Sequence, residues 1–353
     1  MAAELIIVLL NNVLALNLRK TSLNTFHTRL HQWYAKHGRK TLPWRNTDDP
    51  YAIYVSEVML QQTQVKTVLE RYYFPFLKRF PTLRHLAKAP QKEVLQVWQG
   101  LGYYNRALNL HKAAQLCKTG LPASIEELIS LPGIGKNTAH AVAAFAFGQP
   151  VAVMEANVKR VCARIFAMTS LNDGELWEKA NLLLDTKQSF DYNQAMMDLG
   201  AMVCTKRSPG CRVCPAESIC KGKASPESYP AAKSKKATKV REKKIIVLRN
   251  HKGQYYATAR NSRFLNGLFH FVEMEPDSAH FTLGQKKYSL AKARQLGDIC
   301  QQYSHFTLEA EVFLLEVGRL QGPDWHSAAE LAKLPLSMAE QKILRLLGIG
   351  ISN

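Results

Sequence analysis

The sequence predicts a mostly α-helical domain followed by a smaller α+β domain. Between residues 24 and 225, apolar residues recur at steps of three and four, which is the spacing of one helix face. From residue 244 onward, short apolar runs separated by turn residues are typical of strands. A chain of 353 residues, 46% of them hydrophobic, is long enough and apolar enough for two such domains.

The first 23 residues are expected to form an N-terminal extension. Residues 5–16 are apolar except for Asn11 and Asn12. This run is too short to span a membrane, because a spanning helix needs about 20 residues. Positive charge follows the run, at Arg19 and Lys20, whereas a signal peptide carries it in front. We therefore expect an added helix or an upstream start codon here, with membrane attachment as the alternative.

Charge narrows the class of partner. The chain carries 47 Lys and Arg against 28 Asp and Glu, a formal net charge of +19. Such an excess predicts a polyanionic partner, with nucleic acid considered first and a membrane surface second.

Prolines divide the region 24–225 into many short helices joined by tight turns. The predicted breaks are at Pro50, Pro75, Pro81, Pro90, Pro122 and Pro132.

One of these turns has the sequence pattern of a phosphate-binding hairpin. Leu131-Pro-Gly-Ile-Gly-Lys136 lies between two helical segments. Gly133 and Gly135 permit a tight turn that exposes backbone amides, and the N-terminus of the following helix adds its dipole. The pattern predicts a helix–hairpin–helix that grips a DNA phosphate with Gly133, Gly135 and Lys136, without reading base sequence. The alternative is an ordinary corner between two helices.

Four of the seven cysteines fall in one short segment, with the pattern Cys204-x6-Cys211-x2-Cys214-x5-Cys220. Four thiolates at this spacing can enclose one metal centre, and the spacing alone leaves zinc and an iron–sulfur cluster both open. An odd total argues against a disulfide framework. The other three thiols are expected to be ordinary buried side chains: Cys117, Cys162 and Cys300.

Two carboxylates are candidates for acid–base chemistry. Glu57 lies among apolar helical neighbours, which should raise its pKa and suit it to act as a general acid. Glu155 follows the apolar run 151–154 and opens a helix, where a carboxylate is often only a cap. N-glycosidic cleavage needs an acid for the leaving base and a carboxylate to stabilise an oxocarbenium ion. The pair fits that chemistry if the fold brings the two together.

Amides and aromatics gather at two further helix ends, in Gln61-Gln-Thr-Gln64 and Leu101-Gly-Tyr-Tyr104. Side chains of this kind suit insertion into a duplex from which a base has been flipped. The alternative for both tyrosines is packing in the core. Neither segment decides the function alone.

A change of composition separates the two domains. We expect the helical domain to end at residue 225, a basic linker to cover residues 226–243, and the second domain to cover residues 244–353. Seven of the twelve residues 233–244 are Lys or Arg. Strands are predicted over residues 245–249, 254–259, 268–275 and 307–317, and a final helix over residues 338–347.

Together these motifs resemble the endonuclease III superfamily of helix–hairpin–helix glycosylases and, within it, the MutY adenine DNA glycosylases. The resemblance runs from about residue 30 to the end and is strongest before Cys220. Its most specific stretches are Gly38-Arg-Lys-Thr-Leu-Pro-Trp44, residues 56–65, Gly100-Leu-Gly-Tyr-Tyr104 and residues 193–202. The resemblance implies a [4Fe-4S] cluster on Cys204, Cys211, Cys214 and Cys220, and a C-terminal domain of Nudix-like fold.

The resemblance also implies roles for single residues. Glu57 falls on the acid that protonates adenine N7 and later helps to activate water. Asn157 falls on an Asn that orients the catalytic carboxylate. Gln61 and Gln62 fall where the family supports the extrahelical site and intrudes into the duplex, and Tyr103 falls on its intercalating Tyr. In the second domain, Tyr303-Ser-His305 is similar to a Phe-Ser-His loop that recognises 8-oxoguanine through Ser304 and His305.

The implied function is a monofunctional DNA glycosylase of base excision repair. It would excise adenine opposite 8-oxoguanine or guanine by hydrolysing the N-glycosidic bond. The expected partner is double-stranded DNA with such mispairs, with no membrane partner. We expect a monomer in the cytoplasm, associated with the nucleoid. A glycosylase for oxidised pyrimidines or mismatched thymine is the alternative within the same fold.

The sequence departs from the family pattern at several positions. The family's catalytic Asp–Gly is Glu155–Ala156 here, and one extra methylene moves the charge by about 1 Å, enough to slow catalysis about a hundredfold. A lesion-binding protein with impaired catalysis is therefore the alternative function.

Other departures concern the hairpin and the second domain. Asn137 stands where bifunctional relatives carry a Schiff-base Lys. The second domain has no Nudix box, so we expect no pyrophosphate hydrolysis. Residues 264–268 differ from the family's usual Leu-Trp-Gly-Gly-Leu.

Overall fold

The computed structural model describes residues 21–231, 238–320 and 322–350. The chain forms two compact units, one from residues 1–61 and 119–234 and the other from residues 62–118 and 235–353. The apolar run expected at residues 5–16 lies outside the described residues. Within the described part, no helix is both long and apolar enough to cross a membrane.

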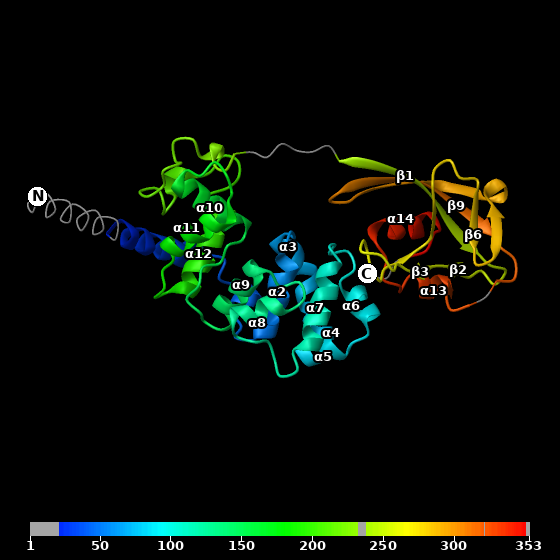
Figure 1. Ribbon diagram of the computed structural model, residues 1–353, viewed down its shortest axis with the longest axis horizontal. Coiled ribbons are helices and arrows are strands. Elements are labelled where there is room, and N and C mark those ends of the chain that lie inside the picture. Colours follow the sequence, from blue (N-terminus) through cyan, green and yellow to red (C-terminus); the bar gives the residue numbers. More distant parts are fainter. Residues whose placement is uncertain (1–20, 232–237, 321, 351–353) are drawn as a thin grey trace, which may run out of the picture. The chain divides into compact units, whose positions relative to one another are not determined.

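The first unit is helical, as predicted (Figure 1). Residues 21–37 are helical. The helices that follow are α2 (Pro50–Leu60), α8 (Ile125–Ser130), α9 (Lys136–Ala146), α10 (Ala156–Phe166), α11 (Asp173–Leu183) and α12 (Ser189–Met202). The helix of residues 21–37, α10, α11 and α12 share a core that includes Phe26, Leu30, Met154 and Leu199, and α2 and α9 share another that includes Ile53 and Ala141. Burial of these side chains from water is what holds the short helices together.

Local signals in the sequence explain where these helices begin. The Asp49 side chain accepts a hydrogen bond from the Tyr51 amide at 3.0 Å, and Pro50 occupies the first turn of α2. Ser124 caps α8 in the same way, by accepting from the Glu127 amide at 3.1 Å. The amides at the start of each helix are thereby satisfied, which fixes the direction in which the helix leaves its loop.

Gly200 allows α12 to approach the start of α10 closely. A Cβ atom at Gly200 would lie 2.6 Å from Cβ of Asn157 and 3.0 Å from its backbone. Any larger residue would therefore push α10 away from α12. This close approach sets the position of Asn157 and of Glu155, which directly precedes α10.

The second unit contains two sets of elements. Its helices are α3 (Val65–Thr67), α4 (Tyr73–Arg79), α5 (Leu83–Lys88), α6 (Gln91–Val97) and α7 (Asn105–Leu116), with a π-helical turn over Val68–Tyr72. Phe76, Phe80 and Trp98 pack edge to face in the core of these helices, with ring centroids 5.0–5.8 Å apart. The remainder of the unit is the C-terminal sheet with its helices.

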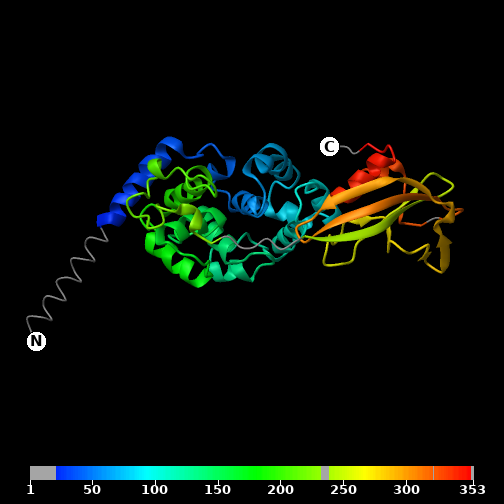
Figure 2. The ribbon, with the colours of Figure 1, turned by 90° about the horizontal axis from the view of Figure 1, so that it is seen from above.

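The sheet has the strand order β10-β2-β1-β9-β8, and β5 pairs with the other part of β1. Its strands are β1 (Lys239–Arg249), β2 (Tyr255–Tyr256), β5 (Val272–Met274), β8 (Arg294–Gln302), β9 (Phe306–Glu316) and β10 (Trp325–His326). β1 runs parallel to β9, and β8 is antiparallel to β9. Helix α14 (Met338–Leu346) packs against one face of the sheet, as Figure 2 shows. The predicted α+β architecture is confirmed.

Some elements differ from the sequence prediction. β1 begins at Lys239, inside the range expected to be linker, because its exposed first half pairs with β9 through the backbone and needs no apolar side chains. The strand predicted over 254–259 is divided into β2 and β3 (Thr258–Ala259), and that over 268–275 into β4 (Phe269–His270) and β5. Three strands had no clear signal in the sequence: β8, and the hairpin of β6 (His280–Leu283) and β7 (Lys286–Ser289).

Candidate active site

Glu57 lies on α2, among side chains that are almost all buried. Its own side chain is partly exposed. Burial, and next the negative charge of Glu155, raise the pKa of Glu57 to about 7, while Arg45 lowers it. A carboxyl with this pKa holds a proton at neutral pH in a large fraction of molecules, which is what a general acid requires.

Glu155 occupies the residue just before α10, with extended backbone (φ −80°, ψ 174°). Its side chain makes no capping hydrogen bond to the helix, but the side chain and the amide of Asn157 both interact with its carboxyl. Burial raises the pKa of Glu155, whereas Asn157, Arg160 and Arg39 lower it. Its Oε1 atom is buried without a hydrogen-bond partner among the described residues. That oxygen is available to accept a hydrogen bond from a bound group or to stabilise positive charge on it.

The fold therefore brings the two predicted carboxylates into one site. They are separated by nearly a hundred residues in the sequence, yet the charge of Glu155 is the second-largest influence on the pKa of Glu57. One carboxyl tends to keep its proton because its neighbour is negative. A pair in which one carboxyl holds a proton and the other is ionised would supply the acid and the anion that N-glycosidic cleavage needs.

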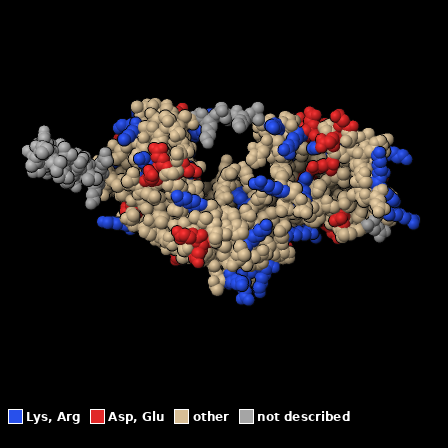
Figure 3. Space-filling view, in the orientation of Figure 1, with Lys and Arg blue, Asp and Glu red and all other residues tan. Residues whose placement is uncertain are grey.

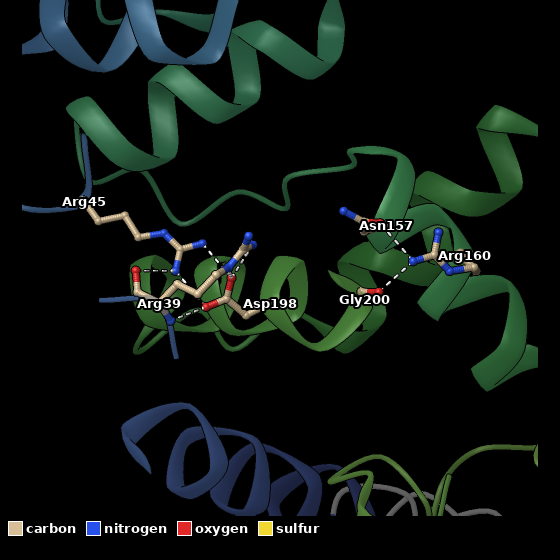
Figure 4. A network of polar contacts seen from close by, with 6 residues as sticks. All are labelled: Arg39, Arg45, Asn157, Arg160, Asp198 and Gly200. Atoms are coloured by element: carbon tan, nitrogen blue, oxygen red, sulfur yellow. Dashed lines mark hydrogen bonds and ion pairs between the residues drawn. The ribbon is translucent and has the colours of Figure 1, made fainter. Parts of the chain in front are cut away.

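A buried ion cluster that sequence reasoning missed supports the pair (Figure 4). Asp198 on α12 is fully buried and accepts from Arg39 Nε at 2.7 Å and from Arg45 Nη1 and Nη2 at 2.8 and 2.9 Å. Burial alone would raise the pKa of Asp198, but hydrogen bonds and charge from Arg45 and Arg39 lower it. Both arginines and Asp198 fall within or next to the stretches that carry the family resemblance, which was the available signal.

These arginines also act on the two glutamates. Arg45 lowers the pKa of Glu57 and Arg39 lowers the pKa of Glu155. Asp198 therefore holds two positive charges near the two carboxyls, and its own negative charge offsets one of them. The cluster limits how far burial can drive both glutamates to the neutral state.

Asn157 is held by a second set of contacts, also drawn in Figure 4. Arg160 Nη2 donates to Oδ1 of Asn157 at 2.9 Å and to the Gly200 carbonyl at 2.7 Å. Arg160 Nε donates to the Cys204 carbonyl at 2.9 Å. With Oδ1 fixed by Arg160, the Asn157 amide group keeps one orientation near Glu155.

The predicted hairpin forms between α8 and α9. Gly133 has a φ of 76°, which a residue with a side chain rarely adopts, and Gly135 caps α9 without a side chain. The first amides of α9 thus have no side-chain acceptor from their cap residue and can face an anion.

Two further contacts involve the start of α9. Gln61 Nε2 donates to Oγ1 of Thr138 at 3.1 Å, which joins the end of α2 to α9. Lys136 places its ammonium 4.4 Å from the Trp177 ring centroid.

Comparison with known proteins agrees with this geometry. The family model described as HhH-GPD superfamily base excision DNA repair protein matches residues 55–184. An adenine DNA glycosylase from Buchnera aphidicola subsp. Baizongia pistaciae is 35% identical, over 80% of this chain and 84% of the relative. The chain belongs to the adenine DNA glycosylase family.

Further relatives extend this finding. The adenine DNA glycosylase of Homo sapiens is 42% identical over 57% of this chain and 40% of its own length. Among solved structures, a thermostable thymine-DNA glycosylase matches 57% of this chain and 97% of its own, with a TM-score of 0.54 and 29% identity. The helical glycosylase fold expected from the sequence is thereby confirmed.

In this family member the four clustered cysteines line one cavity: Cys204, Cys211, Cys214 and Cys220. Burial raises the pKa of Cys220, and so does the charge of Cys204 and Cys211. Arg164 Nη1 donates to Sγ of Cys204 at 3.3 Å. The described residues contain no group of three or more His, Cys, Asp or Glu arranged to hold a metal ion.

The remaining cysteines of this glycosylase differ among themselves. Cys162 is buried and Cys117 is partly buried, but Cys300 is exposed, so the expectation of a buried thiol is wrong there. Cys300 lies on β8, where successive side chains alternate between the two faces. Ile299 takes the core position and Cys300 therefore points outward.

The two residues expected to enter the duplex, Gln62 and Tyr103, are both exposed in the second unit. Each has a left-handed backbone, with φ of 55° and 49°, which is costly for a residue with a side chain. Arg106 Nη2 holds both segments, because it donates to Thr63 Oγ1 at 3.2 Å and to the Gly102 carbonyl at 3.1 Å. Packing accounts for Tyr104, which is buried, but not for Tyr103.

Ser304 and His305 form the exposed tip of the turn between β8 and β9. The Tyr303 amide closes this turn by donating to the Phe306 carbonyl at 2.8 Å. The Phe264 ring packs against Tyr303 and Phe306, with ring centroids 5.2 and 5.3 Å apart. The turn is therefore rigid at its base and open at its tip, as a recognition loop would be.

Proposed function

We propose that this protein removes adenine from double-stranded DNA in which the adenine lies opposite 8-oxoguanine or guanine, by hydrolysis of the N-glycosidic bond. The observation that carries the proposal is the pair of Glu57 and Glu155 in one site, the first with a pKa of about 7. Membership of the adenine DNA glycosylase family supports the choice of base. Because this chain has Glu155 where the family has Asp, the first property to test is whether the protein excises adenine.

In the proposed reaction Glu57 donates its proton to N7 of adenine. The bond between C1′ and N9 then breaks, and its electron pair leaves with the base. Glu155 lies beneath the positive charge that develops at C1′, and its unpartnered Oε1 is the atom available for that contact. Water adds at C1′ and returns a proton to Glu57, while Asn157 keeps Glu155 in position.

DNA contacts are proposed for two regions. The amides around Gly133 and Gly135, with Lys136, bind a phosphate, and Gln61 keeps that hairpin against α2. Gln62 and Tyr103 enter the duplex, where their strained backbones keep the side chains exposed. The net charge of +19 supports a polyanionic partner, and Figure 3 shows Lys and Arg side chains gathered over α5.

The second domain is proposed to recognise the oxidised base. Ser304 and His305 contact 8-oxoguanine from the tip of their turn. The division into a helical domain (residues 24–225) and a C-terminal domain (residues 244–353), and the Nudix-like character of the latter, belong to the same proposal. The linker expected over residues 226–243 is shortened by β1, which begins at Lys239. We further propose that the protein acts as a monomer in the cytoplasm.

The four clustered cysteines would hold a [4Fe-4S] cluster. They are the candidate ligands because all four line one cavity and Arg164 supplies a cation that would offset thiolate charge, although the described residues do not already form a metal-binding group there. The cluster would fix the loop that follows α12 and so support Arg160, which bonds the Cys204 carbonyl. No step of base removal needs it.

Hydrolysis without a lyase step is proposed because Asn137 stands at the position of the Schiff-base Lys. Borohydride trapping on lesion DNA tests this point, since a covalent protein–DNA adduct would contradict it. Such an adduct would favour the alternative glycosylases for oxidised pyrimidines or mismatched thymine.

A lesion-binding protein with impaired catalysis is the second candidate. The observation that favours it is Glu155, which is longer than the family Asp and whose pKa burial raises. The deciding experiment is single-turnover release of adenine from an 8-oxoguanine:adenine duplex, with adenine:thymine as the control. Release from the mispair supports the enzyme. Tight binding without release supports the second candidate.

A further inference from the structure

We propose that the hydroxyl groups of Tyr104 and Tyr303 couple the lesion-reading turn to the loop that presents Tyr103, through the Leu336–Ser337 segment. All these residues belong to the second compact unit. The inference rests on the proposed function, because it requires that the turn with Ser304 and His305 binds the oxidised base. It makes Tyr104 and Tyr303 positioning residues for lesion discrimination.

The Tyr104 hydroxyl closes the loop that presents Tyr103. It accepts a hydrogen bond from the Gly100 amide at 3.1 Å, and Tyr104 itself follows Tyr103 directly. The first and last residues of the loop 100–104 are therefore tied to each other through one oxygen. Trp98 Nε1 also donates to the Gly102 carbonyl at 3.0 Å, so the left-handed backbone of Tyr103 is held from both sides.

The same hydroxyl reaches the C-terminal part of the unit. It donates to the Leu336 carbonyl at 3.3 Å, while the Leu336 amide donates to Oε1 of Gln99 at 3.0 Å. Both backbone polar groups of Leu336, which is buried, thus contact the segment that carries Tyr103. A third contact, from Gln341 Nε2 to the Leu336 carbonyl at 3.2 Å, joins Leu336 to α14.

Ser337 continues the path to the lesion-reading turn. Its hydroxyl donates to the Glu340 carboxylate, so its single proton is already used. The Tyr303 hydroxyl, 3.3 Å from Ser337 Oγ, must therefore be the donor in that contact. Tyr303 is the first residue of the turn whose next two residues are Ser304 and His305.

Both tyrosines are in the state that this path needs. Burial raises the pKa of Tyr104 to about 12, and burial also raises the pKa of Tyr303 to about 12. Each hydroxyl keeps its proton at neutral pH and can donate. The family's Phe-Ser-His loop has no hydroxyl at the position of Tyr303, so this link is a property of the present chain.

The consequence is a linkage between two sites. When Ser304 and His305 bind the oxidised base, the position of Tyr303 is fixed, and through Ser337 and Leu336 so is the closed form of the loop 100–104. Part of the lesion's binding energy then favours the arrangement of Tyr103 that supports base removal. Guanine opposite adenine would gain less, because it makes fewer contacts with the turn.

The test compares single-turnover excision from 8-oxoguanine:adenine and guanine:adenine duplexes for Tyr104→Phe, Tyr303→Phe and the double variant. Each single variant should lower the ratio of the two rates by about two- to tenfold, the range expected for loss of one hydrogen bond. The double variant should lower it no further than the larger single effect, because both act on one path. Tyr256→Phe is the matched control, since Tyr256 packs on Trp325 away from this path.

Thermal unfolding checks that each variant folds. If Tyr104→Phe keeps the wild-type ratio, or slows both substrates equally, the coupling is refuted and the contacts serve only stability. Additive effects in the double variant also overturn it. A wild type with no preference for 8-oxoguanine would instead overturn the proposed lesion reading, and the coupling with it.

Discussion

Burial and the charge of Glu155 together raise the pKa of Glu57 to about 7, so the protonation of Glu57 depends on the charge of Glu155. The pair joins a residue inside α2 to a residue at the entry of α10, both in the first compact unit. One group is suited to hold a proton and the other to carry charge. This relationship leads to the first two predictions.

Glu57→Gln should reduce adenine excision by about 10²- to 10⁴-fold, because it removes the proton donor while it keeps the shape of the side chain. Duplex binding should change little. In the wild type the single-turnover rate should fall as pH rises through about 7, since the pKa of Glu57 is raised to that value and the acid form is lost above it. Rates measured across pH check both points. An active Glu57→Gln enzyme would refute the assignment.

Glu155→Gln should lower single-turnover excision by about 10²- to 10³-fold, because it removes charge at nearly constant shape. Glu155→Asp is the matched variant, and it should be at least as fast as the wild type. Equal rates for wild type and Glu155→Gln would make Glu155 dispensable. Inactivity of all three proteins, with tight lesion binding, would support the lesion-binding alternative.

Joint replacement of Ser304 and His305 by Ala should reduce the preference for 8-oxoguanine:adenine over guanine:adenine. The expected loss is on the order of tenfold, because side-chain contacts to one base edge are removed. Excision from the guanine mispair should fall less. Competition between the two duplexes measures the ratio directly, and an unchanged ratio would mean that this turn does not read the lesion.

Purified protein should be coloured and should contain about four irons per chain. Replacement of Cys204 or Cys214 by Ser should remove colour and iron, whereas Cys300→Ser should retain both because Cys300 is exposed and outside the cavity. Iron analysis and visible absorption check this independently of activity. A colourless, zinc-loaded and fully active preparation would contradict the cluster.

Asp198→Asn should destabilise the first unit by about 3–5 kcal/mol, because Arg39 and Arg45 would lose the buried charge that pairs them. The pKa of Asp198 is lowered from 3.8, so its contribution is present above that pH and is lost as pH falls below it. Chemical denaturation of both proteins at neutral and acid pH measures this. A difference in stability that persists unchanged into acid would argue against a charge effect.

Much of the chain could be predicted without coordinates. The helical spacing, the hairpin around Gly133 and Gly135, and the change to strands after residue 244 are local patterns that one segment records by itself. Backbone propensities and capping residues such as Asp49 and Ser124 act over a few residues. For the same reason the sequence could indicate Glu57 as an acid from the apolar residues of its own helix.

Tertiary structure decided what depends on contacts between distant segments. Asp198 meets Arg45 across 153 residues, and Tyr104 meets Leu336 across 232 residues. The parallel pairing of β1 with β9 extended a strand into a polar segment, and the alternation of side chains along β8 exposed Cys300. No periodicity in one segment encodes such contacts, because they form only when burial of many apolar side chains offsets the entropy of closing the intervening chain.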